Sequence, residues 1–342
     1  MKASGGPGPV CLTLCSSCKC RRAVLKCKSP GFSIGIFLPP WQAIREGRVA
    51  DGCRKPLVPV LDHGSAPGVY LLSNLERGGS DRGKTGLTPK TMAQIVTRGL
   101  VLREVNYKEG DKILTVLAEG QGKRTVKAPG CGRKNSPLAA GAQLLVFSDM
   151  TIFDYQERWI LKEAATVAEF RSLRSDLERL ALGTYFAEVV ESVAEEGVET
   201  PGLLSLILNS LYALDTLKKP LELVKAAFEI KLCCLAGYEP LLDGCGVCGA
   251  EPPVNPMLHL REGLLHCGPC RKELGEGISL PLDPSALSAL RYIVYGDPRK
   301  LFSFTLPKES LETLSGVAEG FLLTQLERGF RTLDFYKSLR QT

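Results

Sequence analysis

The sequence predicts an α+β multidomain protein in which a small β barrel precedes an α-helical domain with an inserted cysteine ribbon. Three observations predict this fold. Short β-rich runs alternate with turns over residues 92–165, apolar residues recur at helical spacing over 166–342, and two close pairs of cysteines interrupt the helical region. A chain of 342 residues can hold two domains with separate cores, and 44% hydrophobic with 23% charged residues is typical of a globular protein.

Residues 1–91 lack the pattern of a folded domain. Glycine and proline recur there, and no period of 2 or 3.6 residues persists. We expect this segment to be disordered, or to result from a start assigned upstream of a true start at Met92. The segment also contains several cysteines between Cys11 and Cys27, but without a repeated spacing they are only a weak signal for metal binding.

Five short β-rich runs follow. They cover residues 95–105, 112–118, 124–128, 144–147 and 151–155. Turn-forming residues separate these runs, and a long loop over 130–141 carries Arg133 and Lys134. Five short strands in under 70 residues predict a small closed or sandwich-like β domain, and an OB-like barrel is the natural interpretation.

The period changes to 3.6 after Thr166. The apolar residues between Phe170 and Tyr185 fall on one face of a predicted amphipathic helix. Further helices are predicted over 203–217, 221–236, 284–295 and 308–328. The expected boundary residues are Pro220 at a helix start, Asp283 as an N-cap with Pro284 in the first turn, and Gly237 as a C-cap.

Two C-x2-C pairs lie between the helices predicted over 221–236 and 284–295. Cys245 and Cys248 form the first pair, Cys267 and Cys270 form the second, and eighteen residues separate the pairs. Each pair fits a tight knuckle that offers two thiolates to a tetrahedral ion, and the intervening length allows a hairpin. Four sulfur ligands leave no open position, so the sequence predicts one structural zinc ion in a ribbon over 243–273.

Two other chemistries were weighed for these cysteines. The tetrapeptide 267–270, CGPC, is the thioredoxin dithiol, but a redox pair needs no second C-x2-C and expects a βαβ setting. A nucleobase deaminase needs a glutamate two residues after its histidine, and His259 has none. We therefore expect His259 and His266 to be strand side chains, and Gly249 and Gly268 to supply positive φ angles at the knuckles.

The segment 123–134 is a candidate nucleic-acid track because it has five basic residues and no acidic residue. The five are Lys123, Arg124, Lys127, Arg133 and Lys134. By the period of a strand, Lys123 and Lys127 share one face while Arg124 points to the other. The alternative is that these charges only keep the surface soluble. Tyr107 also has two interpretations, a base-stacking platform or a buried barrel residue.

The sequence does not indicate an enzyme. It has no phosphate-binding G-x-x-x-x-G-K-[ST] motif, no recognisable Ser-His-Asp set and only three histidines. No apolar run is long enough to span a bilayer, so no membrane association is expected. Thirteen cysteines without an export signal predict a reducing compartment, the cytoplasm.

Several short motifs resemble one known family in their order and spacing. They are GLVLR at 99–103, NYKE at 106–109, KILTVL at 112–117, GCGRKNS at 130–136, and GYEPL at 237–241 shortly before Cys245. Together they resemble the bacterial RecO family of recombination mediators over residues 92–340. Pro129, Gly132 and Pro137 stand where many relatives carry basic residues, so the loop has fewer charges than is usual in that family.

The resemblance implies an OB-fold domain, a helical domain with a zinc ribbon, and no active site. It also implies binding of single- and double-stranded DNA, annealing of complementary strands, and action at the bacterial nucleoid. The implied partners are single-stranded-DNA-binding protein (SSB), RecR and, indirectly, RecA. The alternative from another class is a zinc-ribbon scaffold of transcription or translation, in which the barrel is only structural.

Overall fold

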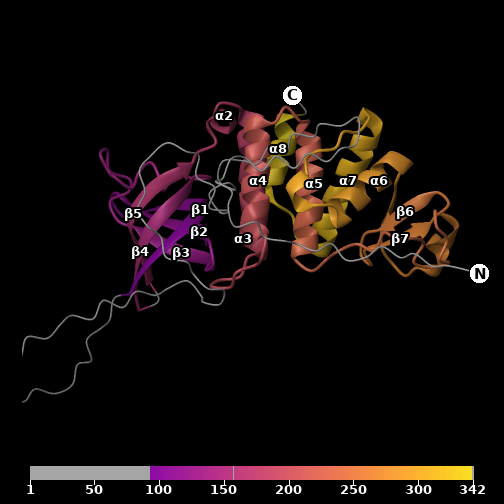
Figure 1. The fold of residues 1–342 in the computed structure, drawn as a ribbon, viewed down its shortest axis with the longest axis horizontal. Helices are drawn as coiled ribbons and strands as arrows, with labels where there is room; N and C mark the ends of the chain where they lie inside the picture. The colour runs from indigo at the N-terminus through magenta and orange to yellow at the C-terminus, as the bar shows by residue number, and fades with distance from the viewer. Residues whose placement is uncertain (1–92, 157, 341–342) are drawn as a thin grey trace, which may run out of the picture. The chain divides into compact units, whose positions relative to one another are not determined.

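The computed structural model describes residues 93–156 and 158–340. These residues form a β barrel, a body of helices and a small sheet that carries the cysteine pairs, so the predicted α+β arrangement is confirmed (Figure 1). The expectations for residues 1–91 lie outside the described residues and stay predictions. None of the described helices is both long and apolar enough to cross a membrane.

Five strands build the barrel. They are β1 (Ala93–Tyr107), β2 (Asp111–Ala118), β3 (Gly122–Ala128), β4 (Phe147–Tyr155) and β5 (Arg158–Ala168). The strands pair in the order β1-β2-β3-β5-β4, and β1 also pairs with β4, which closes the sheet. The β3–β5 pairing is parallel and the other pairings are antiparallel. This is an OB-like arrangement.

The barrel interior follows the period of a strand. On β3, Val126 and Ala128 point into a core that Met150 and Trp159 also fill, while Lys127 between them points outward. Two sequence predictions differ from this structure. Residues 144–147 are turns up to the first residue of β4, and β5 was not predicted. Its Lys-Glu-Ala-Ala centre is typical of a helix, but pairing along β4 overrides that local preference.

Seven described helices make up the body. They are α2 (Arg171–Arg174), α3 (Leu177–Val193), α4 (Leu203–Thr216), α5 (Leu221–Leu235), α6 (Pro284–Tyr295), α7 (Lys308–Gln325) and α8 (Arg331–Leu339). The single helix predicted after Thr166 is two helices, because the Asp176 carboxylate accepts the backbone N–H groups of Glu178 and Arg179 and starts α3. The helix predicted over 308–328 ends at Gln325, and α8 was not predicted.

Several predicted helix boundaries are confirmed. Asp283 caps α6 by accepting the N–H groups of Ser285 and Ala286, and Pro284 occupies the first turn. Gly237 has φ of +91° after α5, where the Tyr238 N–H donates to the Cys233 carbonyl. This is the glycine-dependent helix ending expected from the sequence.

A buried ion-pair network fixes α5 in the helical body. The ammonium group of Lys225 lies 2.9 Å from a carboxylate oxygen of Glu229 and 2.9 Å from one of Glu319 on α7. The Tyr185 hydroxyl donates to Glu229 at 2.8 Å. Because Lys225 and Glu229 are almost fully buried, each charge depends on the other for compensation.

The cysteine-bearing sheet is an excursion between α5 and α6. It contains β6 (Pro256–His259), β7 (Leu264–Cys267) and β8 (Ser279–Pro281) in the order β7-β6-β8. A short 3-10 turn, Pro269–Glu273, follows β7. The sheet shares apolar residues such as Leu258 and Leu265 with the core of the helices, which anchors it to the helical body.

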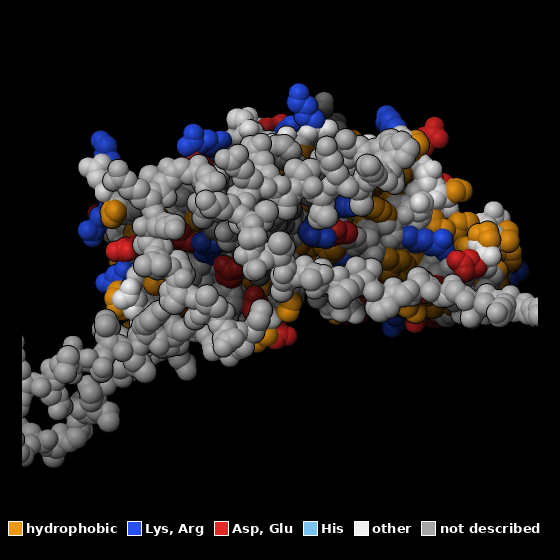
Figure 2. All heavy atoms as spheres, viewed as in Figure 1, with side chains coloured by type: hydrophobic (Ala, Val, Ile, Leu, Met, Phe, Trp, Pro, Cys, Tyr) orange, Lys and Arg blue, Asp and Glu red, His pale blue; other side chains and the backbone are white. Residues whose placement is uncertain are grey.

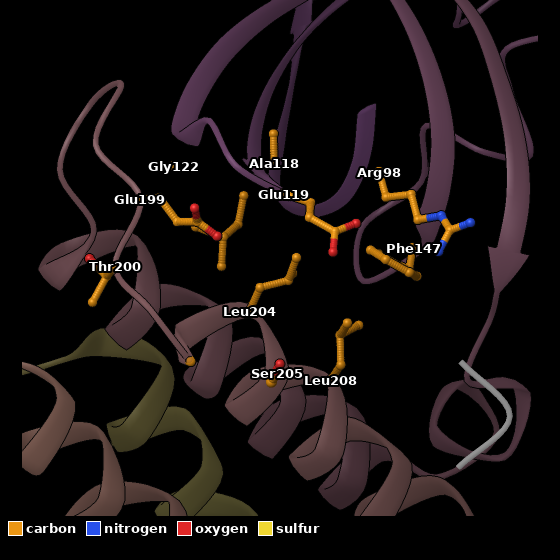
Figure 3. Close-up of a pocket in the computed structure, with 12 residues that line it drawn as sticks. Arg98, Ala118, Glu119, Gly122, Phe147, Glu199, Thr200, Leu204, Ser205 and Leu208 are labelled. Carbon is orange, nitrogen blue, oxygen red and sulfur yellow. The ribbon is translucent and has the colours of Figure 1, made fainter. Parts of the chain in front are cut away.

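The barrel and the helical body share a packed junction. Leu100, Leu117 and Phe147 of the barrel belong to the same apolar cluster as the helix residues. A cavity of about 50 Å³ remains where the barrel faces α4, with Leu204 and Leu208 on the helix side (Figure 3). A space of this size accepts a few water molecules but not a nucleotide.

Candidate metal centre and nucleic-acid interface

The four predicted cysteines converge on one point. The sulfur atoms of Cys245, Cys248, Cys267 and Cys270 all lie within 4.8 Å of one another, and those of Cys248 and Cys267 are 3.9 Å apart. A tetrahedral ion with metal–sulfur bonds of about 2.3 Å needs sulfurs roughly 3.8 Å apart. The cluster therefore can hold a metal ion with only small adjustments.

Backbone N–H groups point at the sulfurs. The Cys267 and Cys248 N–H groups donate to the Cys245 sulfur at 3.3 and 3.5 Å, and the Val254 N–H donates to the Cys267 sulfur at 3.2 Å. Gly249 has the expected positive φ of +73°. The expectation for Gly268 was wrong: its φ is −52°, because it starts the right-handed 3-10 turn at Pro269.

The four thiols differ in how readily they lose a proton. Burial raises the pKa of Cys245, but the donated N–H groups outweigh this effect and lower it to about 6. The hydrogen bond with Cys248 and then burial raise the pKa of Cys270 to about 12. Several negative charges cannot share so small a space without a cation, so this donor set suits a metal that binds sulfur.

The two ribbon histidines are strand side chains, as predicted. His259 and His266 are fully buried on β6 and β7. The His259 Nδ1 accepts the Glu262 N–H, and the ring of His266 is hydrogen-bonded to the Cys267 carbonyl and the Ser279 hydroxyl. The metal-ligating group found among the described residues contains only the four cysteines.

Two of the five basic candidates lie at the junction with the helices. The Lys123 ammonium donates to the Glu191 carbonyl of α3 at 2.8 Å, and the backbone of Lys123 bonds to residues 195–197. Arg124 points to the other side of β3, as the strand period predicts, and stacks over Trp159 with its guanidinium carbon 4.9 Å from the ring centre. Both cations are engaged within the protein.

Lys127 lies at the other end of β3 and is held by one carboxylate. Its ammonium is 3.0 Å from an oxygen of Asp111, the first residue of β2. The same carboxylate accepts the Gly130 N–H at 2.8 Å and so ties the following loop to the barrel. These two interactions, the Gly130 bond first, hold the pKa of Asp111 below its ordinary value.

Arg133 and Lys134 are exposed on that loop. The loop folds against the β1–β2 turn, where the Gly132 N–H donates to the Gly110 carbonyl at 2.9 Å. The Arg133 side chain passes close to Gly110, where a side chain in place of the glycine hydrogen would approach it to 3.0 Å. The loop and the turn therefore form one continuous surface.

Sequence reasoning missed two further cations on this surface. Lys108 lies on the β1–β2 turn, and Lys162 lies on β5 beside the loop, 5.7 Å from the Phe153 ring centre. Tyr107 is 43% exposed, which excludes the buried interpretation. Lys162 could be found from the sequence only if β5 were first predicted as a strand. Alternation along that strand then places Lys162 on the outer face, opposite the inward-facing Trp159 and Leu161.

We call this group the loop-side cluster. Its members are Tyr107, Lys108, Lys127, Arg133, Lys134 and Lys162. In Figure 2, Lys and Arg side chains stand along the outer edge of the barrel at the left of the view. The cluster has the two components of a single-strand site, a set of cations for phosphates and an accessible aromatic ring.

Comparison with known proteins identifies the family. The family model for the recombination protein O N terminal matches residues 92–170, and the model for the recombination protein O C terminal matches residues 174–334. The chain belongs to the RecO family. This membership confirms the resemblance found in the motifs and indicates a role in DNA repair and recombination.

Curated relatives agree with this assignment. The chain is 34% identical over 251 residues to the DNA repair protein RecO of Acetivibrio thermocellus, covering 72% of this chain and 98% of the relative. It is 30% identical over 256 residues to the protein of the same name from Symbiobacterium thermophilum, covering 73% and 99%. The similarity to the protein from Caldicellulosiruptor bescii is 28% over 249 residues, covering 73% and 100%.

Proposed function

We propose that this RecO protein is a non-enzymatic recombination mediator. It would bind single- and double-stranded DNA through the loop-side cluster, anneal complementary strands, and act with RecR to load RecA onto strands coated by SSB. Its site of action would be the bacterial nucleoid in the cytoplasm. Membership of the RecO family supports the choice of partners in this proposal, whereas the binding surface is argued from the residues of this chain.

The exposed cations of the loop-side cluster carry the proposal. Arg133 and Lys134 project from one loop, Lys108 lies on the adjoining turn, and Lys162 borders the same loop. Spaced cations on an exposed loop suit a polyanion of any base sequence, because phosphates repeat regularly along every strand. Lys127 would join them when a phosphate competes for its ammonium with Asp111.

Lys123 and Arg124 would serve the fold in this proposal. Both were candidates for phosphate contact from the sequence, but Lys123 has a partner on α3 and Arg124 has one on β5 of the barrel. Moving Lys123 to a phosphate would remove a hydrogen bond to the end of α3. The binding track would therefore begin near Lys127 and continue through the loop over 130–136.

The cysteine cluster would hold one structural zinc ion. Four thiolates satisfy a tetrahedral ion completely and leave no position for a substrate. The ion would stabilise the ribbon by joining the knuckle at Cys245 to the end of β7. Such binding energy becomes folding energy for the segment that the ion closes.

Salt-dependent DNA binding and strand annealing test the proposal together. The full chain should bind random oligonucleotides, and the logarithm of its binding constant should fall linearly with the logarithm of the salt concentration. It should also speed the annealing of complementary strands with or without SSB. Each phosphate contact to a single strand contributes a slope of about −0.7. A protein that binds no oligonucleotide at low salt would instead fit a ribbon scaffold, and the mediator proposal would fail.

A further inference from the structure

Tyr107 has the surroundings of a ligand-binding residue. It ends β1, is 43% exposed, and is absent from the apolar cluster inside the barrel. Within the described part of the chain its hydroxyl has no hydrogen-bond partner. A tyrosine kept for stability normally buries its ring or pairs its hydroxyl, and Tyr107 does neither fully.

Two ammonium groups lie over the Tyr107 ring. The Nζ atom of Lys108 is 5.4 Å from the ring centre, and that of Lys127 is 5.7 Å away. These cation–π contacts orient the ring on the surface. Both ammonium groups are on mobile side chains, so a base that stacks on the ring would displace them from it and leave them free to pair with the adjacent phosphates.

A cavity bordered by Arg133 and Lys162 lies within the loop-side cluster. It measures about 500 Å³ and is lined by Arg133 and Lys162, by the polar Asn135 and Ser136, and by the apolar Leu138 and Leu161. Its described lining residues include no acidic side chain. The Arg133 side chain connects this cavity to the β1–β2 turn that follows Tyr107, because it packs against Gly110.

We propose that Tyr107 stacks one unpaired base, and that the cavity between Arg133 and Lys162 receives the neighbouring nucleotide. This inference rests on the proposed DNA binding. It adds a physical reason why the protein would distinguish single-stranded from double-stranded DNA. An unpaired nucleotide can present a base face to the ring, whereas both faces of a paired base are covered within a duplex. The cations serve either form of DNA, but the ring serves only the single strand.

Replacement of the ring separates stacking from charge. We would measure the affinities of full-length wild type, Tyr107→Ala and Tyr107→Phe for an oligothymidylate, a duplex of equal length, and an oligonucleotide of abasic sites. Stacking of one base is lost in the alanine variant, so its affinity for the oligothymidylate should fall about tenfold. Its affinities for the duplex and the abasic strand should match those of wild type, and Tyr107→Phe should behave as wild type throughout.

The outcomes distinguish this inference from the proposed function. Equal losses on all three ligands in Tyr107→Ala, or no loss on any, would overturn stacking while leaving DNA binding by RecO intact. Failure of wild type to bind any of the three would overturn the proposed function itself. Circular dichroism and thermal unfolding would verify that Tyr107→Ala keeps the barrel, as expected for a side chain that is only partly buried.

Discussion

Lys123 and Lys127 lie on the same face of β3 but in opposite surroundings. Lys123 meets the end of α3 and donates to a backbone carbonyl, and the neighbouring Arg103 pairs with Glu191 at 2.9 Å. Lys127 pairs with Asp111 and lies over the exposed ring of Tyr107, near a loop with two exposed cations. Two lysines on one strand thus differ in their surroundings: Lys123 joins the barrel to α3, whereas the ammonium group of Lys127 stays on the exposed surface.

The same contrast separates the helical body from the loop side of the barrel. In the helical body, Lys225 is enclosed by Glu229 and Glu319, and in the adjoining sheet the four cysteine sulfurs converge on one point. On the loop side, Arg133 and Lys134 point outward. The charges in the helical body are compensated within the protein, whereas those of Arg133 and Lys134 stay exposed to solvent.

Loss of a metal ligand should give the largest effect, and only on stability. Cys245→Ser should release zinc and destabilise the ribbon and adjoining helices by roughly 3 kcal/mol or more, because metal binding energy is folding energy there. Metal content and thermal unfolding would measure this, with Cys234→Ser, outside the cluster, as the control. Full metal content in Cys245→Ser would contradict the closed site.

A charge reversal at the junction should have the next largest effect. Lys123→Glu places a carboxylate against the backbone carbonyl of Glu191 and removes a hydrogen bond, so the free energy of unfolding should fall by about 1–3 kcal/mol. Denaturant unfolding would measure the change, and Lys123→Met, which keeps the apolar stem, should lose less. If Lys123→Glu instead lowered DNA affinity at unchanged stability, the two ends of β3 would not differ as described.

The matching reversal at the loop side should change binding more than stability, because Lys127 is partly exposed and the variant loses only its ion pair with Asp111. Lys127→Glu should weaken oligonucleotide binding about tenfold and make the salt slope shallower by about 0.7. Fluorescence anisotropy across a salt series would measure both values. Lys308→Glu, on an exposed side chain of α7, controls for net charge, and equal losses in the two variants would argue against a local site.

Release of Lys127 should produce the smallest effect, in the opposite direction. Asp111→Asn keeps an oxygen that can accept the Gly130 N–H but removes the charge that holds Lys127, so DNA affinity should rise about twofold. Because the pKa of Asp111 is lowered in the folded state, its carboxylate stabilises the fold at neutral pH, and the variant should be slightly less stable.

Glu109→Gln is the matched control for this last change. Glu109 is exposed on the adjoining turn and is not the carboxylate that pairs with Lys127. Its substitution by glutamine removes one negative charge from the same surface. A gain confined to Asp111→Asn would show that release of Lys127 matters. An equal gain in Glu109→Gln would show only a general effect of charge.

Local features of the sequence determined a large part of this protein. The spacing of Cys245 to Cys270 predicted which four side chains would meet, and Asp283 and Gly237 predicted where helices begin and end. Each of these depends on residues near one another in the chain or on a fixed ligand geometry. The motif order over residues 92–340 was likewise sufficient to indicate the RecO family, which the comparisons confirm.

Contacts between distant residues decided the rest. Strand β5 exists because it pairs with β4 and β3, against the helical preference of its own centre. The five basic residues of the track were all visible in the sequence, but the partner of Lys123 is 68 residues away. Sequence thus supplied the charges and the tyrosine, whereas tertiary packing determined which were enclosed by α3 and which stayed open to solvent, because burial and pairing depend on neighbours that only the folded chain brings together.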